Sequence, residues 1–211
     1  MRAPHPALTR YYRDEAERRR FLDAMFDQTA GSYDRLDAVM SLGVGLDPSP
    51  GMLAEHARRP FPARLVRGVA ESLPFADATF DFVTMGYALR HVPDLLATFA
   101  EYRRVLRPGG HMLVLDFYRA THAAMRGLGR VYLGVMVPRM ARLACASRPL
   151  QRLMEYCWDT VASSLPPTAI VEALTAAGLE VVRLKCWGLI ADYHAARPAD
   201  GPRAPGGTGT H

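Results

Sequence analysis

Lysine is almost absent from this chain, since Lys185 is the only one, and arginine therefore supplies nearly all of the net charge of +5. We interpret the arginine bias as compositional, because no basic run is interleaved with aromatic residues as in nucleic-acid-binding modules. Nucleic acid is therefore not expected as a partner. The three cysteines are scattered without metal-ligand spacing, which indicates a reducing compartment and predicts no metal site.

Long apolar runs are also missing. No stretch approaches the roughly 20 residues needed to cross a bilayer, and the polar N-terminus lacks the apolar core of a signal peptide. The sequence is thus expected to be cytoplasmic. At 211 residues it is long enough for one domain with a sizeable core.

One stretch, residues 69–117, carries the clearest pattern. Residues 80–85 (FDFVTM) and 111–117 (HMLVLDF) predict two buried strands, and residues 95–106 predict a helix between them that Pro108 and the two following glycines end. Such a strand–helix–strand unit belongs to an α/β fold with a parallel sheet.

Four short motifs in this stretch carry a resemblance. They are Ala-Glu-x-Leu-Pro-Phe at 70–75, Phe-Asp-x-Val-Thr at 80–84, Leu-Arg at 89–90 and Val-Leu-Arg-Pro-Gly-Gly at 105–110. In this order and spacing the sequence resembles class I S-adenosylmethionine (SAM) dependent methyltransferases, most closely the ubiquinone/menaquinone biosynthesis C-methyltransferases. The resemblance covers roughly residues 20–198 and implies a Rossmann-like sheet with helices on both faces.

The resemblance also implies site residues. Asp47, in the pattern Asp-x-Ser-x-x-Met-Leu, corresponds to the residue that binds the ribose hydroxyls of SAM. Val69, Ala70 and Gly86 fall at further cofactor positions, although Val69 stands where the family has Asp or Asn for the adenine amino group. Tyr33 belongs to a Phe-Asp-x-x-Ala-x-x-Tyr-Asp lid; alternatively, it packs on the domain beside a helix cap.

One family segment is missing. The first strand and its Asp-x-Gly-x-Gly-x-Gly loop, whose amides approach the cofactor, should lie between the lid and Asp47. Residues 43–47 (GVGLD) instead lead directly into the end of the second strand; a substitute loop at Gly43–Gly45 is the alternative. We therefore expect weak or absent SAM binding, and the 80–85 strand to be an edge or to be paired with residues 63–67.

Arg90 and His91 follow that strand and are the candidate catalytic residues. His91 could serve as a general base, and Arg90 could hold an oxyanion or a carboxylate. The alternative is structural: Arg90 pairs with Asp94 or Asp116 and His91 caps a loop. Asp116, at the end of the second strand, is expected at the mouth of the pocket.

Residues 117–154 contain seven arginines and no Asp or Glu. In the family this insertion caps a lipophilic acceptor, so we expect a lipophilic or aromatic acceptor and peripheral membrane contact. The alternative is a core-packed helix with snorkelling arginines. A helix at 169–177 and strands at 179–184 and 189–194 complete the expected fold.

These expectations define one domain over residues 1–198. Its lid comprises residues 14–43, its core 44–117 and 166–198, and its acceptor cap 118–165. Residues 1–12 are expected to be frayed and 199–211 to form a disordered tail. Three interpretations stay open: an active methyltransferase, a non-catalytic relative that binds a ligand or partner, and a sequence from which a coding segment has been lost. The oligomeric state is not predicted.

Overall fold

The computed structural model describes residues 4–5, 8–14, 16–18, 20–22, 24, 44–58, 64–144 and 148–199. Its strands form two sheets, one of four strands in the order β3-β4-β6-β5 and one of two strands, β1-β2. The bounds are β1 Val44–Asp47, β2 Arg64–Arg67, β3 Phe80–Gly86, β4 Leu106–Phe117, β5 Glu180–Trp187 and β6 Ile190–Ala196. The helices are α2 Pro50–His56, α3 Leu95–Val105, α4 Ala123–Val131, α5 Val137–Ala144, α6 Arg148–Ser163 and α7 Pro167–Ala176, with short helices η1 Leu89–His91 and η2 Tyr132–Met136.

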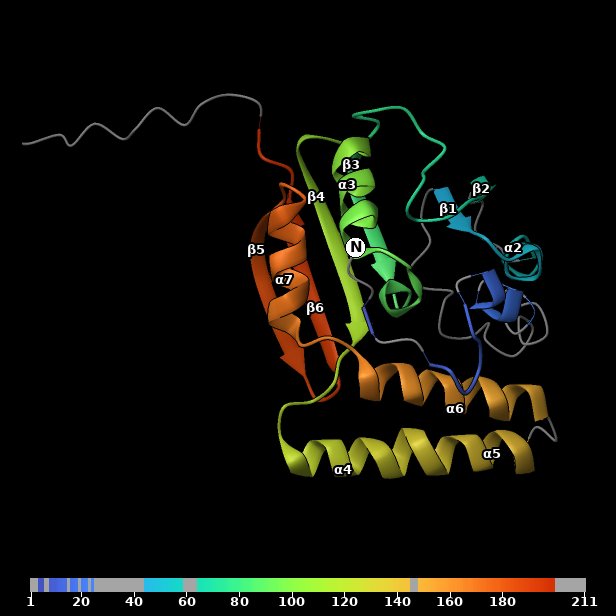
Figure 1. Cartoon of the computed structure of the whole chain (residues 1–211). Coiled ribbons are helices and arrows are strands. Elements are labelled where there is room, and N and C mark those ends of the chain that lie inside the picture. Colours follow the sequence, from blue (N-terminus) through green and yellow to red (C-terminus); the bar gives the residue numbers. More distant parts are fainter. Residues whose placement is uncertain are drawn as a thin grey trace, which may run out of the picture.

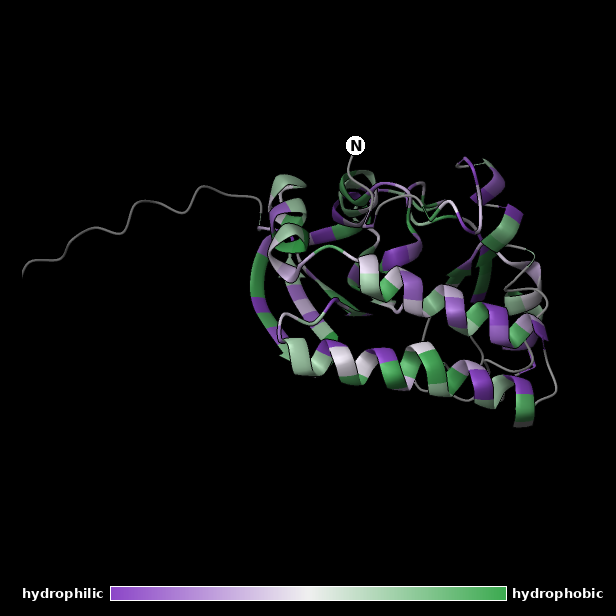
Figure 2. Cartoon of the chain, turned by 60° about the horizontal axis from the view of Figure 1, so that its bottom comes forward, coloured by the Kyte–Doolittle hydropathy of each residue, from purple (hydrophilic) through white to green (hydrophobic). Residues whose placement is uncertain are grey.

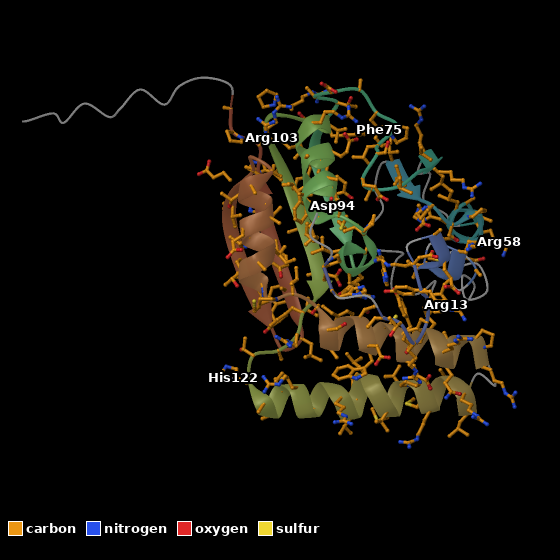
Figure 3. The ribbon with its side chains drawn as sticks, in the orientation of Figure 1. Arg13, Arg58, Phe75, Asp94, Arg103 and His122 are labelled. Carbon is orange, nitrogen blue, oxygen red and sulfur yellow. The ribbon has the colours of Figure 1, made fainter. Side chains whose placement is uncertain are left out.

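The predicted strand–helix–strand unit is confirmed as β3, α3 and β4, with β3 and β4 parallel. Asp94 begins α3, because its side chain accepts hydrogen bonds from the backbone N–H groups of Leu96 and Ala97 (Figure 3). The second strand begins earlier than predicted, at Leu106, directly after the helix. Its two glycines make this entry feasible: Gly109 has a φ of +79°, and a Cβ on Gly110 would lie 2.8 Å from the Arg107 carbonyl oxygen.

The closing elements are also as expected. Helix α7 is followed by Gly178 at a φ of +80°, and β5 and β6 then pair antiparallel to each other, with β6 also antiparallel to β4. Helices α3 and α7 pack together on one face of the four-stranded sheet (Figure 1). The main core lies there and includes Leu95, Phe99, Leu106, Met112, Val114, Leu174 and Tyr193.

The two-stranded sheet is separate from the four-stranded one. Strands β1 and β2 pair parallel, with Val44 opposite Arg64 and Asp47 opposite Arg67, and they lie beyond β3 in Figure 1. Among the described residues no strand pairs with the outer edge of β3. The expectation that the 80–85 strand becomes an edge is confirmed, and Val44–Asp47 is a strand rather than a substitute loop.

Beyond the carboxyl end of β4, the chain forms a helical cap. Helices α4, η2 and α5 make one nearly continuous rod, and α6 lies between this rod and the sheet (Figure 1). Helix α6 runs from Arg148 to Ser163. No helix of the described residues is long and apolar enough to cross a membrane.

A second core joins the N-terminal segment to α6. Tyr11 and Tyr12 are buried against Leu153 and Tyr156, so the expectation that residues 1–12 are frayed is wrong for these two tyrosines. They are buried because α6 supplies apolar partners that the local sequence does not reveal. Tyr33 and, apart from Ala199, the tail lie outside the described residues.

Candidate functional site

The predicted cofactor residues lie at carboxyl ends of parallel strands. Asp47 ends β1, Val69 and Ala70 follow β2, and Gly86 ends β3. In open α/β sheets ligands bind outside these ends, at the point where the strand order reverses. Here that point falls between β1 and β3, where the two sheets are separated.

Asp47 is held in a local turn. Its Oδ1 accepts the backbone N–H of Ser49 at 2.8 Å, and the Ser49 hydroxyl accepts the N–H of Met52 at 3.1 Å to begin α2. The Asp-x-Ser-x-x-Met-Leu pattern therefore has a structural cause: one side chain closes the turn after β1, and the next begins the helix. This geometry fixes the orientation of the Asp47 carboxylate.

The loop after β2 is fixed from α3. The Leu73 N–H donates to Glu101 Oε2 at 2.8 Å, while Arg104 donates to the carbonyl oxygens of Leu73 and Phe75. The hydrogen bond from Arg104 lowers the pKa of Glu101, so the carboxylate stays charged in this bridge. Ala70 packs against the main core, which places its backbone at the edge of the site.

The end of β3 turns sharply. Tyr87, after Gly86, has a φ of +54°, and its N–H donates to the Leu115 carbonyl oxygen at 2.6 Å. Its ring lies 5.2 Å from that of Phe117. This contact directs the chain into η1, where the candidate catalytic residues lie.

Arg90 forms a buried ion pair with Asp116. Arg90 Nη1 lies 2.5 Å from Asp116 Oδ1, and both side chains are 3% exposed. The same carboxylate accepts the backbone N–H groups of Arg90 at 3.1 Å and Phe117 at 2.6 Å. The pair therefore joins η1 to the end of β4, as in the structural alternative given for Arg90. Asp116 was expected at the mouth of the pocket but is buried inside the protein.

His91 lies between the sheet and the cap. Its ring stacks on Tyr156 of α6 with a centroid distance of 5.8 Å, and Arg18 Nη2 donates to its carbonyl oxygen at 2.9 Å. Burial, together with the positive charges of Arg90, Arg18 and His5, lowers the pKa of His91 well below its usual value. At neutral pH the imidazole is consequently uncharged.

Arg18 and Tyr156 were not among the predicted site residues. Arg18 lies in a Glu-Arg-Arg-Arg run, which reads as a solvated helix face, yet it is 4% exposed. No sequence signal marked it, because its partners lie more than 70 residues away. Tyr156 carried a weak signal, an aromatic residue in an otherwise arginine-rich cap.

A cavity of about 250 Å³ lies beside the cap, where the acceptor was expected. Its walls come from α4, α6, the end of β4 and the β5–β6 turn, and include Tyr118, Arg119, Arg126, Arg130, Trp158 and Leu189. Aromatic and apolar surface with arginines at its margin suits a flat ring that carries polar substituents. Within the described ranges, no group of three or more His, Cys, Asp or Glu side chains could hold a metal ion.

The residues present fit one half of SAM. Asp47 and the backbone at Ala70 suit the ribose and adenine, although the apolar side chain of Val69 provides no hydrogen bond there. In the described part of the chain, no glycine-rich turn follows a strand paired between β1 and β3. Backbone amides for the methionine half are therefore not supplied by these residues.

Comparisons with known proteins agree with this architecture. The family described as "Methyltransferase domain" matches residues 29–114. Among solved structures, a SAM-dependent methyltransferase of Methanosarcina mazei is 20% identical at a TM-score of 0.53, covering 77% of this chain and 85% of its own. One of Thermotoga maritima is 18% identical at a TM-score of 0.56, covering 82% and 99%. The fold is thus that of the SAM-dependent methyltransferases.

Curated relatives define the family more narrowly. A demethylmenaquinone methyltransferase of Mycobacterium sp. (strain KMS) is 36% identical over 181 residues, covering 83% of this chain and 76% of the relative. One of Lysinibacillus sphaericus is 36% identical over 148 residues, covering 68% and 61%. The chain belongs to the menaquinone family of class I SAM-dependent methyltransferases, whose cofactor is SAM.

Proposed function

We propose that this protein transfers the methyl group of SAM to a carbon atom of a quinone-type acceptor, with weakened affinity for SAM. The observation that carries the proposal is the position of His91, which follows β3 in η1 and stacks on Tyr156 of the cap. The similarity of the chain to demethylmenaquinone methyltransferases supports an aromatic, lipophilic acceptor.

Bound SAM supplies a methyl group already activated by its sulfonium. The chain has to align the acceptor with it and make the acceptor carbon more nucleophilic. In this proposal His91 accepts the proton of a ring hydroxyl, which increases the electron density of the ring. Arg90 keeps its place through Asp116, and its positive charge helps to keep His91 unprotonated, so we assign it as a positioning residue.

The proposed acceptor also implies where the protein works. A quinone with a long apolar chain partitions into lipid, so a cytoplasmic enzyme reaches it at a membrane surface. The cap, with its apolar side chains and arginines, is the part of the protein that would contact this acceptor.

A second candidate is a non-catalytic relative that binds a ligand or a partner protein. The observation that favours it is the unpaired outer edge of β3 in the described chain, where the family's first strand and glycine loop should lie. Such a protein would keep the cap and the His91 region but would lack a working donor site.

Radiolabelled methyl transfer distinguishes the two candidates. The protein is incubated with SAM at ~1 mM and a short-chain demethylnaphthoquinol, and labelled product is extracted. His91→Gln should lower the rate by about 10²–10⁴-fold. The matched control is His122→Gln, an exposed histidine at the start of α4 (Figure 3), which should leave the rate unchanged.

Each result has a separate meaning. Product from the wild type that is lost only in His91→Gln supports the proposal. Product formation that persists in His91→Gln contradicts the assignment of His91 as the general base. No product from folded wild-type protein at this SAM concentration favours the non-catalytic candidate.

A further inference from the structure

The rod made by α4, η2 and α5 exposes an unusual number of large apolar side chains. They form the outer face of the cap, which we define as Leu128, Val131, Tyr132, Met136, Met140 and Leu143. Their exposed fractions run from 42% for Met136 to 80% for Leu143. An amphipathic helix of a globular protein normally turns such residues inward, so a contiguous exposed set indicates a binding surface.

The inward side of the same rod carries small residues. Gly129 is buried, and a Cβ added to Gly134 would lie 2.9 Å from the indole of Trp158 on α6. The rod therefore approaches α6 closely through its glycines. The large apolar side chains of the rod are on the opposite side. Figure 2, turned so that this end comes forward, shows green hydrophobic segments along the rod.

The π-helical turn aligns the two halves of this face. Residues 132–136 form η2, whose hydrogen bonds span five residues and which therefore turns less per residue than an α-helix. In an uninterrupted α-helix the apolar residues of α5 would rotate away from those of α4. The slower turn brings Leu128 and Val131 into line with Met140 and Leu143 over a rod of 22 residues, about 33 Å long.

The charge on this rod has one sign. Arg126, Arg130, Arg139 and Arg142 are exposed, and residues 117–154 contain no Asp or Glu. Arg126 donates to the carbonyl oxygens of Ala120 and Thr121. In the described ranges no ion pair involves Arg139 or Arg142, and neither lines the cavity beside the cap, so their charges are available to an external anion.

We propose that the outer face of the cap docks on the surface of an anionic lipid bilayer, with the rod lying in the plane of the interface. The apolar side chains would enter the headgroup region while the arginines contact lipid phosphates. A second copy fits poorly, because a two-fold contact of this face would bring unpaired arginines together. This membrane contact would bring the protein to its lipophilic acceptor, so its purpose rests on the proposed function. The contact itself is tested without SAM or acceptor.

The test is co-sedimentation of the full chain with phosphatidylcholine vesicles, with and without about one third phosphatidylglycerol. We expect binding to the anionic vesicles that weakens between ~0.1 M and ~1 M salt. The double variant Arg139→Gln/Arg142→Gln should bind about 25-fold more weakly, at about fivefold per arginine. Met140→Ser/Leu143→Ser should lose at least ~10-fold.

The matched control is Val182→Ser on β5, which removes an apolar side chain of similar exposure, 55%, from another face and should leave vesicle binding unchanged. Circular dichroism identifies variants that fail to fold. If the apolar variant does not fold, vesicle binding by Arg139→Gln/Arg142→Gln, whose side chains are exposed, decides the test. Binding that is absent, or equal in the arginine variant, overturns the proposal. If the wild type is a dimer and Met140→Ser/Leu143→Ser dissociates it, the outer face of the cap binds a second copy instead. If polyglutamate at equal charge displaces the vesicles, this face binds an acidic polypeptide instead.

Discussion

The buried pair of Arg90 and Asp116 offers the strongest test of how the site is held together. Arg90→Met removes the guanidinium and leaves a comparable apolar volume, so the Asp116 carboxylate loses its 2.5 Å contact. Two backbone donors remain to it, from Arg90 and Phe117. Because the carboxylate stays buried with its charge uncompensated, we expect a loss of about 3–5 kcal/mol in the free energy of unfolding. That is a large share of the ~5–15 kcal/mol available to a typical domain.

Urea unfolding followed by circular dichroism measures this loss. The matched control is Arg107→Met, since Arg107 also lies 2.5 Å from its partner, Asp81, but both side chains are at least half exposed. Removing that pair should cost only about 0–1 kcal/mol. The double variant Arg90→Met/Asp116→Asn should recover much of the loss, because no charge is then buried alone and the amide oxygen can still accept a backbone N–H. Equal small losses for Arg90→Met and Arg107→Met would refute the reasoning.

Two further predictions concern the site and the cap. Because the pKa of His91 is lowered, its contribution to stability should be complete above about pH 6.5 and decline as the pH falls from there toward the lowered pKa; His91→Gln should flatten this part of a stability–pH profile, and an unchanged slope would contradict the shift. Gly134→Val should destabilise the fold by about 1–3 kcal/mol through its clash with Trp158. Gly127→Ala, which meets nothing within 4 Å, should be neutral or stabilising by up to ~1 kcal/mol in thermal unfolding; similar effects of both would contradict the packing described for the rod.

The strand–helix–strand unit could be predicted because its signals are local. An aspartate cap, apolar periodicity and a Pro-Gly-Gly segment act within a few residues of one another. The link between Arg90 and Asp116 was foreseeable as an alternative, since Arg90 follows β3 and Asp116 lies near the carboxyl end of the neighbouring parallel strand β4. The early start of β4 was not, because its pairing across Phe80 and Leu106 depends on the neighbouring strand.

The unpredicted parts depend on contacts between distant segments. Nothing near Arg18 indicates that it will donate to the carbonyl oxygen of His91. The burial of Tyr11 and Tyr12 requires α6, which begins more than 130 residues later. Periodicity also does not reveal the π-turn, which is detectable only once the hydrogen bonds are known.

In the described residues no strand lies between β1 and β3, and no loop there offers glycine backbone amides to SAM, so the central claim is that SAM binding is weakened. Those amides would bind the charged amino-acid end of SAM, and each such hydrogen bond contributes about 1.5–3 kcal/mol. Losing two of them weakens binding by about 10²–10⁴-fold. The proposed adenosine contacts, at Asp47 and Ala70, are not affected by this loss.

Calorimetric titration of the full chain with SAM tests this claim most directly. We expect no saturable binding in the micromolar range, with any heat developing only toward ~1 mM SAM. A dissociation constant of about 1 μM would contradict it. Such a result would mean that backbone amides outside the described residues hold the methionine end of the cofactor.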